Sequence, residues 1–390
     1  RDLHLSIRRQ RQMCIRDSRY SLRWQSTSLS VQQNHLSDEQ KRCFFDDGFI
    51  VIKNVVPRSY TKAAKVLIED VLPRDKRILL VPRELAIHPD VLKLFNQTRL
   101  KTILETELGP FPEVISSQVA VTPAFDAMGG RPSPHVDGSW SGAIPDSAAE
   151  IEPLTGRPLN PIPYFGENDD RRGSNDGQLW QDPDRTISLG SYSALVGVAL
   201  NDQSVPGRGQ FAVLKGMHET VESAFRLQRD TGGVIGPEGP DWPRIKATDE
   251  GRTYLNGLPE SVRARMHEMR ERSDPVDGWE WPELTPVLLE EGDAVIALHS
   301  CPHTATPNRG AEPRMNIYFR IRRLREENPH EGSRRLGHGV SDHLDRGYYG
   351  QFLEYPDTYN PWKTSIDKLC NHWDEWQGMQ DFVAENSLAS

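Results

Sequence analysis

The sequence predicts a mainly β protein with flanking helices, whose core is a double-stranded β-helix, or jelly-roll. After residue 111 the chain consists of short β-like runs separated by loops rich in Gly and Pro. Short strands with turn signals between them are typical of a sandwich or barrel. Before residue 111, apolar residues recur at helical spacing, which predicts helices beside that core.

The region before residue 111 predicts a helix, a strand and then further helices. Ser37 and Gln40 fit a capping box that opens a short helix, and Gly48 ends it. The run "FIVIKNVV" is rich in β-branched residues and predicts a strand. Residues 59–72 have apolar residues at helical spacing, and "HPDVLKLFNQTRLKTILETELG" predicts one helix or a helix pair ending near Gly109.

The region after residue 111 predicts the strands of the core. The β-like runs are 114–122, 193–200, 209–218, 293–300 and 314–321. The last of them, "RMNIYFRI", alternates cleanly, so its polar residues share one face and its apolar residues the other. A jelly-roll normally fills its interior with apolar side chains, so the polar face would ordinarily turn outward. If Arg314 nevertheless points inward, the buried cation needs an anionic partner.

Length and composition predict one large globular domain over residues 34–390. The chain has 390 residues, of which 36% are hydrophobic and 26% charged. Polar inserts interrupt the β region at about 141–190 and 219–285, and a charged, aromatic extension begins at about 325. Long loops on a β scaffold often serve as lids or substrate walls, and family-specific decoration is the equal alternative.

Residues 1–33 differ from the rest, because they are rich in Arg and Ser and poor in acidic residues. Such a segment fits a disordered tail or a mitochondrial targeting segment. It also fits an artefact, since "RQMCIRDS" resembles translated sequencing-adapter text. We favour a tail or an artefact and leave this segment out of the fold prediction.

Charge and cysteine usage narrow the classes of partner and compartment. A net charge of -9 argues against nucleic acid or an anionic membrane as the main partner. No apolar run is long enough to span a membrane. The four cysteines lie far apart without C-x-x-C spacing, which favours a reducing compartment. We therefore expect a cytoplasmic protein, or a mitochondrial one if the N-terminal segment is a genuine targeting signal. The oligomeric state stays open.

An H-x-D triplet at a strand end can supply two ligands of an iron site formed by two histidines and one carboxylate. The chain contains four such triplets, which are His88/Asp90, His135/Asp137, His343/Asp345 and His372/Asp374. In the first, Pro89 intervenes and Asp90 fits a helix N-cap. The last two lie late in the chain, with no strand-borne histidine after them. His135 and Asp137 remain, because they follow one β run and precede the later strands.

Four blocks of the sequence, taken in order, resemble the phytanoyl-CoA dioxygenase family of iron(II)- and 2-oxoglutarate-dependent oxygenases. These blocks are "LSDEQKRCFFDDGFIVIKNVV", "PHVDGSW", "LNDQSVPGRGQFAVLKGMH" and "GDAVIALHSCPHTATPNRGAEPR". Together they span residues 36 to about 322. Each block alone is a weak signal, whereas four in the family's order are a strong one. The resemblance implies a cupin-like jelly-roll core.

The resemblance also implies the metal ligands. His135 and Asp137 correspond to two iron ligands, and His303 to the third, since Asn308 and Arg314 then fall at the family's offsets. His299 is the rival to His303, because it lies on the preceding strand. His218, which closes the third block, is expected to have a structural role beside the site.

The co-substrate residues follow from the same resemblance. Arg314 would pair with the far carboxylate of 2-oxoglutarate, a task that suits the fork of a guanidinium. Gln118 occupies a position that often contacts this co-substrate, and Thr304 or Thr306 could donate a hydroxyl to it. Trp140 is expected to form a wall of the substrate pocket.

The resemblance therefore implies a dioxygenase that uses iron(II), 2-oxoglutarate and O2 to hydroxylate a small organic molecule. Because Asp137 is retained, hydroxylation or a related desaturation is favoured over halogenation. Two alternatives stay open. One is a catalytically silent jelly-roll that binds ligands, and the other is a cupin-like metal enzyme without 2-oxoglutarate, in which Arg314 would have no role.

Overall fold

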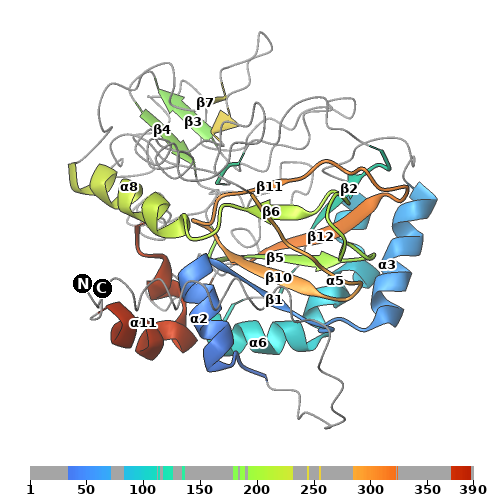
Figure 1. The fold of residues 1–390 in the computed structure, drawn as a ribbon, viewed down its shortest axis with the longest axis horizontal. Coiled ribbons are helices and arrows are strands. Elements are labelled where there is room, and N and C mark those ends of the chain that lie inside the picture. The colour runs from blue at the N-terminus through green and yellow to red at the C-terminus, as the bar shows by residue number, and fades with distance from the viewer. Residues whose placement is uncertain are drawn as a thin grey trace, which may run out of the picture. The chain divides into compact units, whose positions relative to one another are not determined.

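The structure is a computed structural model that describes 13 segments of the chain. These segments are residues 34–71, 83–111, 113–114, 117–125, 134–136, 179–182, 185–188, 192–231, 244–245, 254–255, 284–321, 323 and 370–387. They form mostly sheet with helices, which confirms the coarser part of the prediction, whereas the jelly-roll core stays a prediction (Figure 1).

The larger sheet has five strands in the order β1-β10-β5-β12-β2, and each neighbouring pair is antiparallel. Its strands are β1 (Phe49–Ile52), β2 (Gln118–Thr122), β5 (Ala194–Ala199), β10 (Ala294–Leu298) and β12 (Arg314–Ile321). All five lie within β-like runs of the sequence, although most are shorter than those runs. Strand β12 matches its predicted bounds and is buried throughout.

A second sheet of three strands has the order β11-β6-β9. Its strands are β6 (Phe211–Val213), β9 (Thr285–Pro286) and β11 (His303–Ala305). Phe211 of β6 lies with its ring centroid 5.8 Å from that of Tyr318 on β12, so the two sheets face each other there. The described residues also include the hairpins β3 (Leu179–Asp182) with β4 (Arg185–Ser188), and β7 (Arg244–Ile245) with β8 (Tyr254–Leu255).

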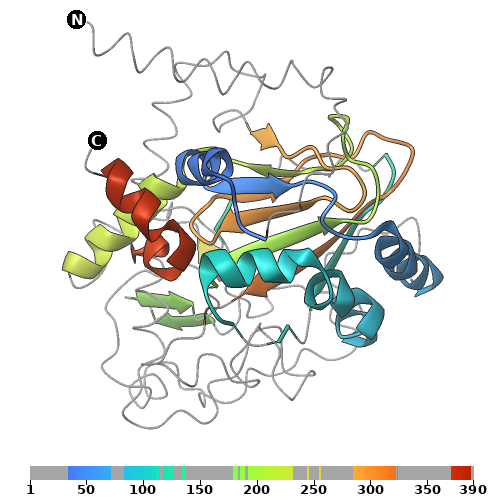
Figure 2. The ribbon, with the colours of Figure 1, turned by 90° about the horizontal axis from the view of Figure 1, so that it is seen from below.

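Helices cover the other face of the larger sheet, where the rings of Phe95 on α5 and Phe319 on β12 lie 5.5 Å apart (Figures 1 and 2). The helices of the N-terminal part are α2 (Asp38–Asp47), α3 (Arg58–Val71), α4 (Arg83–Ala86), α5 (Pro89–Asn96) and α6 (Arg99–Leu108). Later come α8 (His218–Thr231), the 3-10 helices η4 (His372–Glu375) and η5 (Gln377–Met379), and α11 (Gln380–Ser387).

Most of the predicted helix boundaries are confirmed. The Ser37–Gln40 capping box is present at the start of α2, and Gly48 ends that helix with φ 79°. The prediction that Asp90 is an N-cap is wrong. Pro89 occupies the first turn of α5, so the cap is His88, whose ring nitrogen accepts from the Asp90 N–H at 3.1 Å. The 88–109 pattern is a helix pair, α5 and α6.

The segment 370–387 packs on α2. Phe44 lies 5.3 Å from Trp373 and 4.6 Å from Trp376, measured between ring centroids. Phe45 of α2 likewise contacts Phe382 of α11, and the two helices lie side by side in both views (Figures 1 and 2). The segment 370–387 is therefore tied to α2.

The polar face of β12 turns inward, toward the second sheet. Arg314, Asn316 and Tyr318 are all buried. Gly197 on β5, opposite Tyr318, leaves room for the Tyr318 ring, since a Cβ at this position would lie 2.7 Å from the ring. The apolar face of β12 meets the helices instead. The expectation that the apolar face of the strand turns toward the interior between the sheets is thus reversed for β12.

The predicted inserts and termini are described only in part. Helix α8 and the two short hairpins fall within them, whereas residues 1–33, Asp137, Trp140 and the His343/Asp345 triplet lie outside the described residues. The domain bounds stay predictions. In the described part of the chain, no helix has the length and apolar character needed to cross a membrane.

Candidate active site

The structure brings together two of the three predicted iron ligands, His135 and His303. An isolated antiparallel bridge joins them: the His135 N–H donates to the His303 carbonyl at 3.0 Å, and the His303 N–H donates back at 2.9 Å. Their ring centroids lie 4.8 Å apart. Residues 168 positions apart in the sequence therefore present two imidazoles side by side.

Hydrogen bonding fixes which nitrogen of His303 can bind a metal. Its Nδ1 lies 3.0 Å from the Cys301 carbonyl oxygen, which can only accept a hydrogen bond. Nδ1 therefore carries the proton, and Nε2 carries the lone pair of the neutral ring. The Phe211 ring packs beside His303 at 5.2 Å. The imidazole is thus held in one orientation with its basic nitrogen defined.

The third predicted ligand, Asp137, lies outside the described residues, as does the predicted pocket residue Trp140. Among the described residues, no cluster of three or more His, Cys, Asp or Glu side chains could hold a metal ion. The complete ligand set therefore stays a prediction, and the described structure contributes its two histidines.

The rival ligand His299 lies elsewhere. It is buried at the end of β10, where its ring contacts that of Tyr192 at 4.6 Å in an edge-on arrangement. The backbone bridge to His135 is made by His303. Of the two candidates, His303 is thus the one that the fold places beside His135.

Arg314 is buried with an exposed fraction of 2%, yet it makes no ion pair with any described carboxylate. Its Nη1 donates to the Tyr318 hydroxyl at 3.5 Å, and its buried Nε–H has no hydrogen-bond acceptor. Burying a charge without a partner is costly, so such groups are normally paired. Phe211 contacts both His303 and Tyr318, which places this arginine and the histidine pair between the same two sheets.

The other three residues predicted to contact the co-substrate lie in different surroundings. Gln118 is buried on β2, where its side-chain oxygen accepts from Arg320 at 2.8 Å. Thr306 bonds through its hydroxyl to Gln210 at 3.3 Å. Thr304 is buried on β11, and strand alternation turns it to the opposite face from its neighbour His303. Their predicted contacts with a co-substrate stay predictions.

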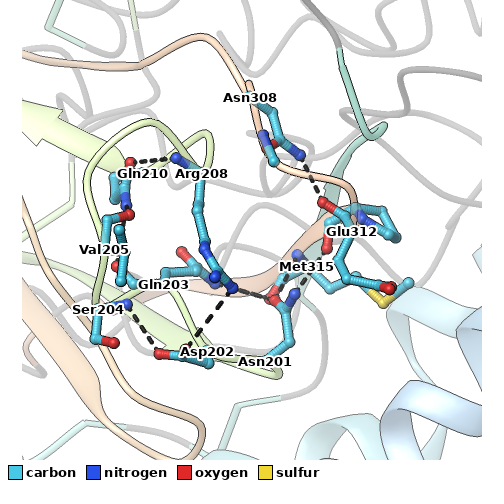
Figure 3. A network of polar contacts seen from close by, with 12 residues as sticks. Asn201, Asp202, Gln203, Ser204, Val205, Arg208, Gln210, Asn308, Glu312 and Met315 are labelled. Atoms are coloured by element: carbon cyan, nitrogen blue, oxygen red, sulfur yellow. Dashed lines mark hydrogen bonds and ion pairs between the residues drawn. The ribbon is translucent and has the colours of Figure 1, made fainter.

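A network of polar side chains, some of them fully buried, holds the start of β12, and the sequence prediction missed it (Figure 3). Asn201 accepts from the Met315 N–H at 3.1 Å and donates to the Pro313 carbonyl at 2.7 Å, so it fixes the backbone on both sides of Arg314. Asn308 donates to three carbonyls, those of Thr122, Pro123 and Glu312, at 3.3, 2.9 and 2.8 Å. No local sequence pattern indicated this network, because the Asn201 contacts join residues 112 and 114 positions apart.

A second buried polar cluster joins α8 to the segment 370–387. Glu222 lies 3.2 Å from Nδ1 of His372 and accepts from the His372 N–H at 3.1 Å. Burial raises the pKa of Glu222 to about 7, and burial lowers the pKa of His372 well below its usual value. Ser300 contacts the same Nδ1 at 3.1 Å. Because serine and glutamate share one ring nitrogen, the arrangement does not fit a hydrolytic triad, in which they occupy opposite nitrogens.

His218 belongs to the same region and makes a structural contact there, whereas its expected place beside the active site stays a prediction. Its Nε2 lies 3.0 Å from the Phe45 carbonyl, which links the start of α8 to α2. Burial lowers the pKa of His218 to about 4, so the ring is neutral at physiological pH. The ring centroid of His372 lies 5.4 Å away.

Comparisons with known proteins give no relative at the level of sequence. No family model matches the chain, and no curated protein matches it. Among solved structures, the chain is similar to HygX from Streptomyces hygroscopicus with nickel, 2-oxoglutarate and hygromycin B bound. The identity is 16%, with 81% of this chain and 97% of that chain covered and a TM-score of 0.41.

Two further solved structures show a similar degree of likeness. EctD from S. alaskensis with 2-oxoglutarate and 5-hydroxyectoine is 16% identical, with 76% of this chain and 79% of that chain covered and a TM-score of 0.39. SnoK, a non-heme alpha-ketoglutarate-dependent carbocyclase from nogalamycin biosynthesis, is 17% identical, with coverage of 82% and 94% and a TM-score of 0.34. Scores this low do not establish a shared fold, so function is inferred from the side chains themselves.

Proposed function

We propose that this protein is a non-haem iron(II)- and 2-oxoglutarate-dependent dioxygenase of the phytanoyl-CoA dioxygenase kind, with a jelly-roll core. The observation that carries the proposal is Arg314. It is a buried guanidinium without an ion-pair partner in the described part of the chain, between the same two sheets as His135 and His303.

The residues present fit the proposed metal. His135 and His303 would hold iron(II) together with Asp137, the two-histidine, one-carboxylate set of non-haem iron oxygenases. The hydrogen bond from His303 Nδ1 to the Cys301 carbonyl supports this role, since it leaves Nε2 as the donor nitrogen. When bound, iron(II) would supply the activation of O2 for hydroxylation.

The residues also fit the proposed co-substrate. A buried arginine with an uncommitted Nε–H suits a dicarboxylate, because a carboxylate can take two N–H donors at once. The Asn201 and Asn308 hydrogen bonds hold the backbone around Arg314, so the guanidinium is supported before any ligand arrives. This chain would thus contribute binding and orientation at the end of the co-substrate remote from the metal.

A metal enzyme without 2-oxoglutarate has no role for the buried charge of Arg314, which weighs against that alternative. A silent binding jelly-roll has no need of the adjacent imidazoles of His135 and His303 together with Arg314, and iron-dependent succinate release distinguishes it from the enzyme. We propose a small organic molecule as substrate, no nucleic-acid or membrane partner, and a cytoplasmic location.

The test is succinate formation from 2-oxoglutarate, with iron(II) and ascorbate, over a panel of candidate substrates. We expect iron-dependent succinate release that one substrate class stimulates. His303→Ala should lose both iron and activity, whereas His299→Ala, the matched rival, should retain iron. If the wild-type protein neither binds 2-oxoglutarate nor releases succinate with iron(II), the proposed function is wrong.

A further inference from the structure

A second hydrogen-bond donor lies beside Arg314, on a residue that neither the sequence resemblance nor the predicted site included. Tyr318 follows Arg314 by four positions on β12 and is buried on the same strand face. Its hydroxyl lies 3.5 Å from Nη1 of Arg314 and 3.0 Å from Nδ2 of Asn316. What this hydroxyl can do depends on the direction of those two hydrogen bonds.

The direction can be worked out from the backbone, starting at Asn201. The Met315 N–H can only donate and the Pro313 carbonyl can only accept, so Asn201 must direct its oxygen to Met315 and its nitrogen to Pro313. The side-chain oxygen of Asn201 is then an acceptor for the next amide in the network, that of Gln203.

Gln203 is oriented by two acceptors on one side. Its Nε2 lies 3.3 Å from the Asn201 oxygen and 3.4 Å from the Met315 carbonyl, so this end must be the NH2 group. The same Nε2 lies 2.6 Å from the side chain of Asn316, which must therefore present its oxygen. Asn316 consequently turns its own NH2 group toward Tyr318.

The Tyr318 oxygen thus accepts twice, from Asn316 and from Arg314. A phenol oxygen has two acceptor positions and one hydrogen, so both acceptor positions are in use and only the O–H donor remains. No described residue accepts it. The Nε–H of Arg314 is likewise without an acceptor. Two uncommitted donors, one of them on a buried cation, therefore lie next to each other.

We propose that Tyr318 is a second donor to the carboxylate that Arg314 binds, with its hydroxyl oriented by the Asn201–Gln203–Asn316 relay. The inference rests on the proposed function and assigns a specificity role within it. Arg314 supplies the charge, and Tyr318 supplies a directional O–H donor that a carboxylate accepts and a methyl group cannot. Tyr318 therefore selects an oxo acid that has a carboxylate at its far end.

The test measures binding by calorimetry to the full-length protein loaded with nickel(II), which avoids turnover. The ligands are 2-oxoglutarate and 2-oxopentanoate, which has the same chain length but ends in a methyl group. Tyr318→Phe removes only the hydroxyl. A hydrogen bond to a charged group typically accounts for roughly tenfold or more in affinity, so we expect the dissociation constant of 2-oxoglutarate to rise by about that factor. The constant for 2-oxopentanoate should not change.

Tyr192→Phe is the matched control, since Tyr192 is a buried tyrosine that contacts His299 and Arg320. It should leave the binding of both ligands unchanged. Equal weakening of both ligands by Tyr318→Phe would mean that Tyr318 acts only on local structure, and no weakening would mean that it makes no contact. Either result overturns the inference while leaving the function intact. Wild-type protein that binds no 2-oxoglutarate would instead overturn the proposed function.

Discussion

Strand β12 carries a buried arginine near each end, and the two differ in their hydrogen bonding. Arg314, at the first position, has one long hydrogen bond to Tyr318 and an Nε–H without an acceptor. Arg320, near the last position, donates to Gln118 at 2.8 Å and lies 5.5 Å from the centre of the Tyr192 ring. Two arginines on one strand face thus differ: the guanidinium of Arg320 is engaged by side chains of the protein, whereas that of Arg314 keeps an N–H donor without an acceptor.

The residues around the two ends of β12 also differ in how far they engage the arginine side chains. At the Arg320 end, Ser193 donates its N–H to the Ile321 carbonyl and its hydroxyl to Glu375 at 2.7 Å, so the segment 370–387 is tied to the sheet. At the Arg314 end, the network fixes the backbone but leaves the guanidinium available. A buried donor that the protein itself satisfies indicates a structural role, whereas an unsatisfied donor on a buried cation requires an explanation, and a ligand is the one proposed for Arg314.

The largest expected effect comes from Arg314→Met. On the proposed function, this variant should raise the apparent KM for 2-oxoglutarate far more than it reduces iron binding. Losing a buried charge pair typically costs on the order of 2–5 kcal/mol, which is roughly 30-fold or more in affinity. The measurement is the KM from succinate formation, with iron content determined on the same preparation.

Arg320→Met is the control for that experiment, because it removes the same charge from the same strand. It should leave the KM for 2-oxoglutarate unchanged. If Arg314→Met has normal co-substrate kinetics, the contrast between the two ends has no functional meaning, and what remains is a metal site on a β scaffold.

How far the sequence predicts this molecule is well illustrated by β12. The alternation in "RMNIYFRI" predicted the strand, its bounds and which residues share a face. It did not predict that the polar face would turn inward, because the usual rule holds for a core that contains no ligand. The sequence analysis allowed for an inward-facing Arg314 only as a condition: if this side chain is buried, its charge needs an anionic partner.

Predictions from the sequence were less successful where the structure depends on contacts between residues far apart in the chain. The juxtaposition of His135 and His303 followed from the family resemblance, and the structure places them together; Asp137 and Trp140 remain untested. Gln203 was missed, because its contact with Asn316 spans 113 residues and no local pattern encodes such a pair. The error at Asp90 was local: Pro89 is preorganised for the first turn, which moves the cap two residues back, from Asp90 to His88.

Arg320→Met should have its own, smaller effect on stability. The variant removes the donor that Gln118 accepts at 2.8 Å and a guanidinium near the Tyr192 ring. Removing a buried hydrogen-bond partner costs about 1–3 kcal/mol. We expect the free energy of unfolding, measured by urea denaturation, to fall by that amount without ligand. A fully stable variant with weakened 2-oxoglutarate binding would reverse the roles assigned to the two arginines.

The segment that anchors the Arg320 end depends on Glu222, and this dependence should vary with pH. Burial raises the pKa of Glu222 from 4.5 to about 7, although Arg226 and the His372 N–H oppose the shift; Asp374 adds to it. In the unfolded chain the carboxyl group ionises near its ordinary value. Between these two pKa values the folded state holds a proton that the unfolded state has lost, so stability falls as pH rises through this window. The lowered pKa of His218 acts in the opposite direction, between about 4 and 6.5.

The smallest predicted effect is therefore that of Glu222→Gln on the pH dependence of stability. Glutamine cannot ionise, so the variant escapes the cost that the wild-type protein acquires as Glu222 loses its proton. From pH 6 to pH 8, the free energy of unfolding of the variant should gain about 1 kcal/mol relative to wild type, since one pKa unit corresponds to about 1.4 kcal/mol. This range lies mostly above the window in which His218 contributes, so the difference reports on Glu222.

Urea denaturation at pH 6 and pH 8 measures the free energy of unfolding of both proteins. If this free energy changes equally with pH in the variant and in the wild-type protein, Glu222 ionises as freely in the folded state as in the unfolded one. In that case Glu222 contributes no pH-dependent stability to the Arg320 end of β12, which the Ser193–Glu375 hydrogen bond and apolar packing would hold without it.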